Sequence, residues 1–241
     1  MDRDLLNQAK WELAAGSRIL ARENVVDAFG HISMRHPEDP ELYLMSRSRS
    51  PELVTRADLL AFRLDNTPVS ETEHRLFAER PIHGALYEAR PDVMSVVHSH
   101  SHSVIPFGLS SVALEQVIHT AGGIPSPAPV WDIRTGFGDT NILVTTGEQG
   151  RDLARAVGDG SAALMRGHGS VVAADSVKRA VLLAIYFEVN ARSLLATHSL
   201  GGGVVTMSPG EQSATAEMTA LPLVAERTWE YWCSRADLSG I

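Results

Sequence analysis

The sequence has a single cysteine, no excess of basic residues and no long apolar run. Because Cys233 has no second cysteine to pair with, no internal disulfide can form, which favours a reducing compartment. The 29 acidic residues outnumber the 21 basic ones and give a formal net charge of −8. This charge argues against a nucleic-acid partner, since phosphate contacts require clustered lysine and arginine.

A membrane-spanning helix needs about 18 or more consecutive apolar residues, and the sequence contains no such run. We therefore expect no membrane partner. The first residues contain acids and lack an apolar core, so we expect no signal peptide. Together with the lone cysteine, these features predict a cytoplasmic protein.

The chain of 241 residues is long enough for one large domain or two small ones. No proline-rich or serine-rich linker and no charge block divides it, so residues 1–241 are predicted to form a single domain. An apolar content of 44% is ordinary for a soluble globular protein, which supports this interpretation.

Two histidines follow a short buried strand that the pattern predicts at 94–97. His98 and His100 are two residues apart, so their rings point to the same side of an extended chain and can bind one ion. A helix is predicted just upstream, from about Pro81 to Arg90. Glu79 directly precedes this helix and is the nearest acid to the pair. Neutral imidazoles suit zinc, manganese, cobalt or iron.

A third candidate ligand, His168, lies far downstream after a predicted apolar strand at 162–165. Gly167 and Gly169 flank it and allow a close approach of backbone and ligand. The alternative is that these histidines are structural, because an isolated His-x-His pair is more often structural than metal-binding. With 10 histidines in the chain, chance pairing is also frequent, and spacing alone leaves the two interpretations balanced.

Helices and strands are predicted to alternate along the rest of the chain. Asp2 is predicted to cap a helix that runs to about Arg22, and Ser176 to cap the longest helix, which runs to about Thr197. On this long helix, Tyr186 and Glu188 lie off the apolar stripe, where they can meet a site or a partner subunit. Further strands are expected at 29–35, 43–46, 58–64, 114–119, 129–133, 142–145 and 170–174, and further helices at 103–110, 148–157 and 209–237.

Two arginines stand among serines in the segment Ser46-Arg47-Ser48-Arg49-Ser50. Such a segment is either a solvated loop or a clamp for an anion. The planar fork of arginine matches the geometry of a carboxylate, which favours an anion of that kind. For either arginine alone, the solvated loop is the commoner outcome.

Five linked motifs resemble the class II aldolase/adducin family, of the metal-dependent fuculose-phosphate aldolase type. The resemblance covers roughly residues 5–199, and the order and spacing of the motifs favour the metal-binding role of the histidines. The motifs are Gly30-x-x-Ser33-x-Arg35, Glu79-x-x-x-His83-x-x-x-Tyr87, Arg90-Pro91-Asp92-Val93, Val97-His98-Ser99-His100-Ser101 and Met165-Arg166-Gly167-His168-Gly169.

The resemblance implies an α/β fold, a three-layer α/β/α arrangement with a central, mostly antiparallel sheet. It implies one divalent metal per subunit, held by His98, His100 and His168. Zinc is favoured by affinity, with manganese, magnesium or cobalt as alternatives. Glu79 takes the place of the family's acid/base glutamate and can also reach the metal in the resting state. The resemblance further implies a homotetramer, or a multiple of it, with sites at subunit interfaces.

The sequence departs from the family's sugar-phosphate aldolases at three places. His31 replaces an asparagine, the segment 46–49 replaces a Thr-Pro-Ser-Gly turn, and Phe77-Ala78 replaces a pair of serines. Phosphate binding needs small residues, so that backbone N–H groups and hydroxyls can reach its oxygens. A phosphorylated sugar is therefore not expected as the substrate.

The altered positions suit a planar carboxylated molecule and resemble the decarboxylating branch of the family. That branch acts on hydroxypyridine dicarboxylates, dihydroxyphthalates and hydroxy-carboxymuconic semialdehydes. Our hypothesis is a metal-dependent decarboxylase of a hydroxylated aromatic or ring-cleaved carboxylic acid in aromatic catabolism, with His31, Arg47, Ser48 and Arg49 binding this small-molecule substrate.

Two alternatives remain. The first is an aldolase or epimerase that acts on an unphosphorylated hydroxy-keto substrate, which the retained histidines permit. The second is a non-catalytic, adducin-like scaffold, against which the intact trio of histidines and Glu79 argue.

Overall fold

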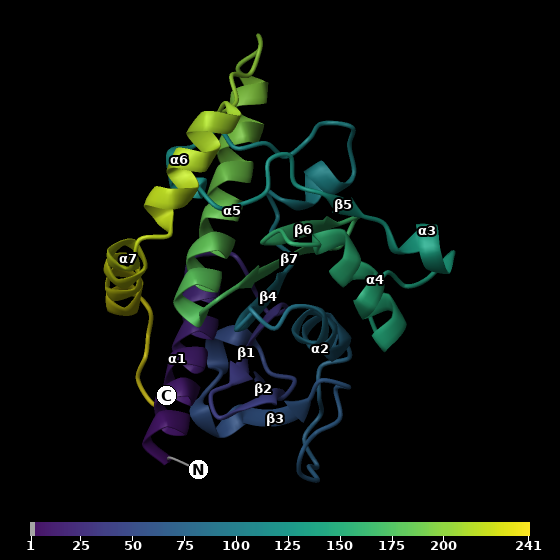
Figure 1. Cartoon of the computed structure of the whole chain (residues 1–241), viewed down its shortest axis with the longest axis vertical. Coiled ribbons are helices and arrows are strands. Elements are labelled where there is room, and N and C mark those ends of the chain that lie inside the picture. The colour runs from purple at the N-terminus through teal and green to yellow at the C-terminus, as the bar shows by residue number, and fades with distance from the viewer. Residues whose placement is uncertain (1–2) are drawn as a thin grey trace.

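A seven-stranded sheet forms the centre of the computed structural model, which describes residues 3–241 (Figure 1). The strand order is β3-β2-β1-β4-β7-β6-β5. Neighbouring strands in the described chain are antiparallel, except β5 and β6, which run parallel. This confirms the mostly antiparallel sheet that the resemblance implies. The strands are β1 (His31–His36), β2 (Asp39–Ser46), β3 (Leu59–Arg63), β4 (Ser95–Ser99), β5 (Val130–Trp131), β6 (Ala162–Met165) and β7 (Gly169–Ala174).

Helices precede the first strand, occupy segments between the later strands and form the C-terminal part of the chain. Their bounds are α1 (Arg3–Arg22), α2 (Arg80–Ala89), α3 (Ile133–Phe137), α4 (Gly147–Val157), α5 (Val177–Ser199), α6 (Pro209–Thr219) and α7 (Pro222–Arg235). Ser176 caps α5 as predicted, since its side chain accepts a hydrogen bond from the N–H of Arg179. The predicted cap of α1, Asp2, lies outside the described residues.

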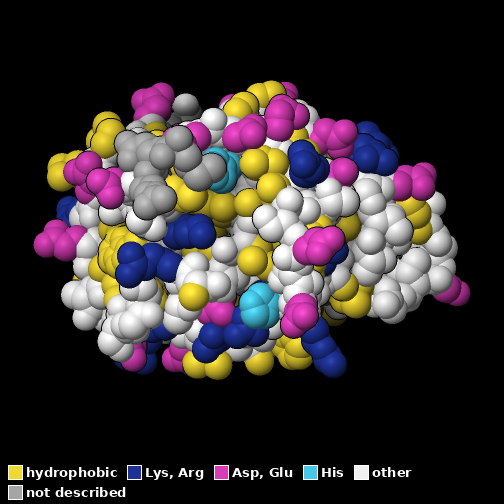
Figure 2. Space-filling model, turned by 90° about the horizontal axis from the view of Figure 1, so that it is seen from below, with side chains coloured by type: hydrophobic (Ala, Val, Ile, Leu, Met, Phe, Trp, Pro, Cys, Tyr) yellow, Lys and Arg dark blue, Asp and Glu magenta, His cyan; other side chains and the backbone are white. Residues whose placement is uncertain are grey.

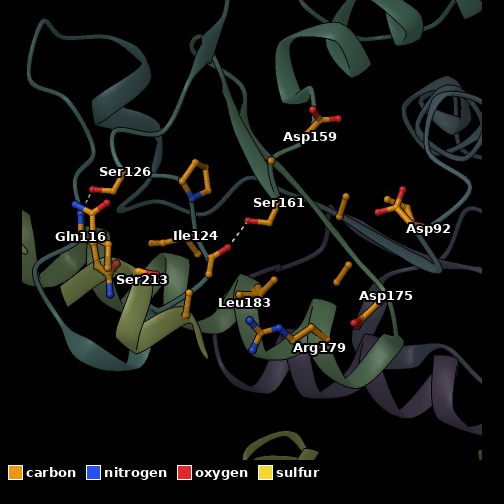
Figure 3. Close-up of a pocket in the computed structure, with 18 of the residues that line it drawn as sticks. Asp92, Gln116, Ile124, Ser126, Asp159, Ser161, Asp175, Arg179, Leu183 and Ser213 are labelled. Atoms are coloured by element: carbon orange, nitrogen blue, oxygen red, sulfur yellow. Dashed lines mark hydrogen bonds between the residues drawn. The ribbon is translucent and has the colours of Figure 1, made fainter. Parts of the chain in front are cut away.

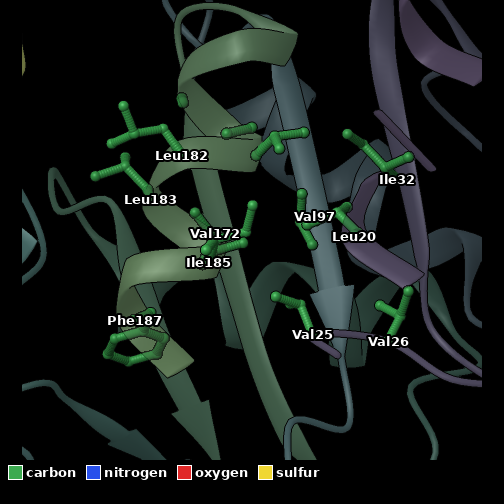
Figure 4. Close-up of a cluster of buried hydrophobic side chains, with 14 of the residues drawn as sticks. Leu20, Val25, Val26, Ile32, Val97, Val172, Leu182, Leu183, Ile185 and Phe187 are labelled. Carbon is green, nitrogen blue, oxygen red and sulfur yellow. The ribbon is translucent and has the colours of Figure 1, made fainter. Parts of the chain in front are cut away.

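Alternate side chains of the central strands enter two different hydrophobic clusters. In β4, Val97 packs with residues of α1 and α5, whereas Val96 packs with residues of α2 and α4. β7 repeats the pattern with Val172 and Val171. Figure 4 shows the first cluster, where Leu20 of α1 lies beside Val97. Helices therefore cover both faces of the sheet, which confirms the three-layer α/β/α arrangement (Figure 1).

Some predicted elements are wrong because their backbone groups have other partners. Residues 114–119 and 142–145 are not strands. Instead, the N–H of Val117 donates to the Asn190 side chain at 2.9 Å, and the N–H of Val144 donates to a glutamate carboxylate at 3.0 Å. The predicted strand at 129–133 shortens to β5, because its last residue already begins α3.

The predicted terminal helix at 209–237 is divided into α6 and α7. Leu221 is extended, with φ −62° and ψ 131°, as the residue before a proline prefers. Pro222 then begins α7, where its missing N–H costs no helical hydrogen bond. The predicted helix at 103–110 forms only as a single 3-10 turn, Ile105–Gly108.

By length and composition, α5 is the one helix among the described residues that is apolar enough to cross a membrane. Its most apolar window has a mean hydropathy of 1.3, and 61% of that window is buried inside the molecule. This window contains charged residues, so it agrees with the absence of an uninterrupted apolar run in the sequence. α5 packs against α1, α7, β4 and β7, so its apolar composition is accounted for by burial on several sides.

Candidate metal centre

Three histidines and one glutamate converge at one end of the sheet. His98 lies in β4, His100 directly follows that strand, and His168 lies in the turn between β6 and β7. Glu79 immediately precedes α2. One ligand atom from each of these four residues, which we call the ligand cluster, lies within 4.8 Å of the others. The sequence predicted all four members.

The turn that carries His168 approaches β4 closely. Ser170 of β7 lies opposite Ser99 of β4 in the register, so the chain just before β7 reaches the end of β4. A Cβ atom on Gly169 would overlap the carbonyl oxygen of Ser99, and Gly167 has a φ of +66°, which favours glycine. A larger residue at either position would therefore strain the turn that carries His168.

The spacing of the ligand atoms is close enough for one metal ion to be shared. His100 Nε2 lies 3.1 Å from His98 Nε2 and 3.1 Å from His168 Nε2. Glu79 Oε2 lies 3.6 Å from His98 Nε2 and 3.5 Å from His168 Nε2. Metal–nitrogen bonds are about 2.0–2.1 Å long, so atoms at these separations could all bind one ion placed among them. The three imidazoles and the carboxylate therefore fit a divalent cation.

The environment of the imidazoles supports this role. His98 Nδ1 lies 3.1 Å from the carbonyl oxygen of Ser170, which holds a proton on Nδ1 and leaves the Nε2 lone pair for a metal. Burial, followed by the nearby His98 and His168, lowers the pKa of His100 to about 4. His100 is therefore neutral at pH 7, which is the form that binds metals. Nδ1 of His168 is buried and has no hydrogen-bond partner among the described residues.

Glu79 is buried, and its two carboxylate oxygens have different partners. Oε1 accepts a hydrogen bond of 3.0 Å from the N–H of Val144, which fixes the side chain and leaves Oε2 facing the histidines. Burial alone would raise the pKa of Glu79, but the neighbouring imidazoles of His168 and His98 outweigh it and hold the pKa well below its usual range. The carboxylate is therefore charged at neutral pH.

His31 lies beside the ligand cluster on β1. It pairs with His98 across the sheet, and the two ring centroids are 5.1 Å apart. The ring of Phe77 lies 4.6 Å away on another side. Burial, followed by the neighbouring His83 and His98, lowers the pKa of His31 well below its usual value. The ring is therefore neutral, and His31 Nδ1 lies 2.7 Å from Nε2 of His83 on α2.

Both arginines of the predicted anion clamp pair with Asp58. Arg47 Nε lies 2.7 Å from Asp58 Oδ1, and Arg49 Nη1 lies 3.0 Å from each carboxylate oxygen. Sequence reasoning missed Asp58, because nothing local marks an acid 9 to 11 residues away as their partner. Two arginines on one carboxylate leave a net positive charge, and both arginine side chains are about one-third exposed.

The loop that carries these arginines leaves the sheet near His31. β2 runs antiparallel to β1, with Met45 opposite Ser33, and His31 begins β1. The end of β2 and the ligand cluster therefore share one end of the sheet. The N–H of Ser48 donates to the carbonyl oxygen of Arg75 at 2.8 Å, which fixes the backbone between the two arginines. Binding of a substrate by this loop remains a prediction.

Replacing Asp58 by asparagine is expected to destabilise the protein by about 2 kcal/mol, which is about 4–8 °C in Tm. Burial opposes ionisation of Asp58, but hydrogen bonds from Thr55, Arg47 and Arg49 outweigh it and lower the pKa to about 2. Because the folded-state pKa is depressed, this stabilisation is present above about pH 4 and is lost as the pH falls toward 2. Thermal unfolding between pH 2 and 7 measures it, with Asp139→Asn, an exposed acid, as the control. A difference that does not change across this pH range would show that the charge of Asp58 is not its cause.

A second acid, Glu188 of α5, holds the chain that follows His100. Its carboxylate accepts hydrogen bonds from the hydroxyl of Ser101 and from the N–H of Ser103. Glu188 and His100 line a cavity of about 240 Å³, together with His102 and residues 24–27. The expectation that Glu188 meets a site is consistent with this position. By contrast, Tyr186 packs beside Trp232, with ring centroids 6.1 Å apart.

A larger cavity of about 600 Å³ lies at the opposite end of the strands (Figure 3). It is bordered by Ala174, where β7 ends, whereas His168 precedes the start of β7. Arg179 and acids such as Asp92 and Asp159 are among its lining residues. Its size alone does not make it the reactive site, because the ligand cluster lies elsewhere.

The surface view in Figure 2 shows acidic, basic and apolar side chains intermixed on one face of the molecule. No broad basic patch covers the described residues on this face, in agreement with the acidic composition.

Comparison with known proteins identifies relatives over most of the chain. Residues 11–195 match the model of the class II aldolase and adducin N-terminal domain. The chain is 29% identical over 250 residues to decarboxylase tropJ of Talaromyces stipitatus, covering 94% of this chain and 93% of that protein. It is 29% identical over 215 residues to 3,4-dihydroxyphthalate decarboxylase of Arthrobacter keyseri, covering 81% of each.

Solved structures share the same fold at lower identity. L-fuculose 1-phosphate aldolase from Glaciozyma antarctica superposes with a TM-score of 0.78 at 20% identity, covering 95% of this chain and 88% of that one. An aldolase II superfamily protein from Pseudomonas syringae gives a TM-score of 0.79 at 22% identity, covering 98% and 94%.

Proposed function

Because the chain belongs to the class II aldolase and adducin family, we propose that it is a metal-dependent carboxy-lyase of that family's decarboxylase branch. Its substrate is a hydroxylated aromatic carboxylic acid, or a ring-cleaved derivative of one. The observation that carries this proposal is the ligand cluster beside His31, with the loop of Arg47 and Arg49 at the same end of the sheet, where a phosphate-binding site would need small residues. The relatives named as decarboxylases support the reaction class.

Decarboxylation leaves an electron pair on the carbon that loses carbon dioxide. A divalent cation held by His98, His100 and His168 would supply a Lewis acid for the charge that develops on a nearby oxygen. The donor set of nitrogens and one carboxylate suits zinc, with manganese, magnesium or cobalt as alternatives.

Glu79 provides the group that handles the proton. Its Oε2 faces the histidines of the ligand cluster, while Oε1 is fixed by the N–H of Val144. When the C–C bond breaks, carbon dioxide leaves without the bonding electrons, and the carbon takes a proton from a water that Glu79 positions, or from Glu79 after its carboxylate has taken up a proton from solvent. The proton is ultimately supplied by solvent, so the reaction consumes one proton for each carbon dioxide released.

The arginine loop provides the binding group for a second carboxylate. Asp58 occupies Nε of Arg47 and Nη1 of Arg49, so other N–H donors of both guanidinium groups remain for a ligand. His31 binds the substrate from β1, and Ser48 adds a hydroxyl between the arginines. Substrate orientation by fixed donors of this kind lowers the cost of reaching the reactive geometry.

The Arg49→Ala variant is expected to raise KM for a dicarboxylic substrate by about tenfold or more, because a charge-assisted hydrogen bond is lost. A monocarboxylic substrate that lacks the second carboxylate should show a much smaller change. Steady-state kinetics on both substrates measures this difference, with Arg63→Ala, an exposed arginine on β3, as the control. Equal effects on the two substrates would assign Arg49 a purely structural role.

The decisive experiment is carbon dioxide release by purified, metal-loaded protein. The substrates offered are ortho-hydroxylated aromatic dicarboxylates and hydroxymuconic semialdehyde acids, with a chelator-treated sample alongside. Metal-dependent release from one of them would establish the decarboxylase. Aldehyde formed from an unphosphorylated hydroxy-keto acid, without release from the aromatic acids, would instead assign aldolase chemistry. A protein that binds no metal and transforms none of these compounds would be the non-catalytic scaffold.

We also propose that the protein is a cytoplasmic homotetramer, or a multiple of it, with sites at subunit interfaces. Two apolar side chains beside the ligand cluster support an interface there. Phe29, which is 64% exposed, stacks on His100 at 6.1 Å, and Leu109, which is 61% exposed, lies next to Gly167. Light scattering of the purified protein measures the assembly, and a monomeric mass would overturn this proposal.

A further inference from the structure

Four buried polar side chains form a continuous hydrogen-bonded row that begins at His31. His31 Nδ1 lies 2.7 Å from His83 Nε2, His83 Nδ1 lies 2.6 Å from Ser33 Oγ, and Ser33 Oγ lies 2.7 Å from the Tyr87 hydroxyl. His31 and Ser33 come from β1, and His83 and Tyr87 from one face of α2. None is more than 5% exposed. The row leads away from the ligand cluster into the core.

We propose that this row fixes the proton of His31 on Nε2, so that His31 presents a neutral hydrogen-bond donor to an anionic oxygen of the substrate. In this proposal His83 is a positioning residue, which acts on the substrate only through His31. The tautomer follows from the hydrogen bonds of the resting protein, whereas its use in binding rests on the proposed decarboxylase function.

The donor in each hydrogen bond of the row is determined by the Tyr87 hydroxyl, which is the buried end and needs an acceptor for its proton. The hydroxyl of Tyr87 has two hydrogen-bond partners among the described residues, the side chain of Ser33 and the backbone of Val96. The Val96 bond lowers the pKa of the phenol, so it comes from an N–H donor, and Ser33 is left as the acceptor of the phenol proton. Ser33 then donates its own proton to Nδ1 of His83. The proton of a neutral His83 is therefore on Nε2, from which it is donated to Nδ1 of His31.

The opposite direction leaves a buried donor without an acceptor. If His31 donated from Nδ1, His83 would donate to Ser33, Ser33 would donate to Tyr87, and the phenol proton would have no acceptor. A buried, unsatisfied hydroxyl is costly enough to favour the first direction by about tenfold or more. Burial of both imidazoles also disfavours a doubly protonated ring, which would donate at both ends.

At the other end of the row, His31 Nε2 is available to a ligand. The structure gives this nitrogen no hydrogen-bond partner, and it is not a buried ring nitrogen shut off from ligands, as His168 Nδ1 is among the described residues. His31 lies beside His98, with ring centroids 5.1 Å apart. A fixed N–H at this position attracts a carboxylate or phenolate oxygen. An imidazole with its lone pair at this position would repel the same oxygen.

The tautomer can be measured directly in the wild-type protein. Long-range proton–nitrogen correlation spectra of protein labelled with ¹⁵N-histidine distinguish a protonated ring nitrogen from an unprotonated one. The His31 signals are assigned by their absence in His31→Gln, and zinc-loaded and metal-free samples are both recorded. We expect Nδ1 unprotonated and Nε2 protonated. A proton on Nδ1 would overturn the inference, whether or not the protein releases carbon dioxide.

Two substitutions at one position separate positioning from packing. His83→Gln can keep the pattern, because an amide N–H can donate to His31 while the amide oxygen accepts from Ser33. His83→Leu fills a similar space and offers neither group. We expect His83→Leu to raise KM by about tenfold with a smaller change in kcat, and His83→Gln to remain within about threefold of wild type.

Metal content is measured in both variants and is expected to equal that of the wild type, since His83 does not belong to the ligand cluster. Equal KM for the two variants would reduce His83 to a packing role and overturn its positioning role. If no tested acid is decarboxylated by the wild type, the proposed function fails. The spectra still decide the tautomer, even if His83→Leu does not fold.

Discussion

The His168→Ala variant is expected to lose its metal and, with it, nearly all turnover. Removing one of three imidazoles leaves two nitrogens and one carboxylate. It also removes one of the two closest nitrogen pairs, because His168 Nε2 lies 3.1 Å from His100 Nε2, as His98 Nε2 does. Changes in residues that merely support metal ligands weaken binding about 10- to 100-fold, so loss of a ligand should cost at least about 100-fold. Metal retained after desalting, measured by elemental analysis per subunit, quantifies the loss.

The design separates the ligand role from general damage to the fold. His168 is at the rim of the sheet in a turn between two strands, and its Nδ1 makes no hydrogen bond within the described chain, so truncation breaks no protein contact through that atom. His198→Ala, at the exposed end of α5, is the matched control and should keep both metal and turnover. Chelator-treated wild type should match His168→Ala in activity. Wild-type metal content in the variant would remove His168 from the ligand set.

The ligand cluster could be predicted from the sequence because local signals mark its members, and because the resemblance to the family links motifs that lie far apart in the chain. The two-residue period of a strand places His98 and His100 on one side, and glycines on both sides of His168 mark a tight approach. The strands β4, β6 and β7 are also buried on both faces, and their short apolar runs mark them in the sequence. A two-residue strand such as β5 has too few residues to show any period, and its predicted bounds were wrong.

Contacts between distant segments could not be predicted from the sequence. Asp58 offsets part of the positive charge of Arg47 and Arg49, although it lies 11 residues from Arg47 in the sequence. His83 contacts His31, which is 52 residues away in the sequence. The sequence marked His83 as part of a motif, but not as the partner of a residue beside the metal centre. Such pairs depend on how α2 packs on the sheet, which local propensity does not determine.

The clamp on Glu79 is another feature without a sequence signal. The N–H of Val144 that holds Glu79 follows Ile142, a β-branched residue with φ of +59°. Such residues rarely enter this region, and the strain is on the order of 1–3 kcal/mol. The turn is therefore less stable than an unstrained one, and it directs the N–H of Val144 at the carboxylate of Glu79. Strain of this kind is concentrated at functional sites, which agrees with a Glu79 that must hold one orientation.

The Glu79→Gln variant is expected to retain metal and to lose turnover by about 10²- to 10⁴-fold, which is the range for removal of a general acid or base. Glutamine keeps the shape of the side chain and a carbonyl oxygen that can accept from the N–H of Val144. The three imidazoles remain, so metal binding should weaken only modestly. What is lost is a group able to accept and return a proton at the substrate.

Two measurements on the same samples test this separation. Elemental analysis gives metal per subunit, and carbon dioxide release under saturating substrate gives kcat, with Glu88→Gln on the exposed side of α2 as the matched control. If Glu79 only oriented the histidines, metal content and turnover would fall together in Glu79→Gln. If turnover stayed at the wild-type level with metal bound, proton transfer would have to be assigned to another group. A large loss of kcat with metal retained is the combination that places the proton transfer on Glu79, because the geometry of the site is otherwise preserved.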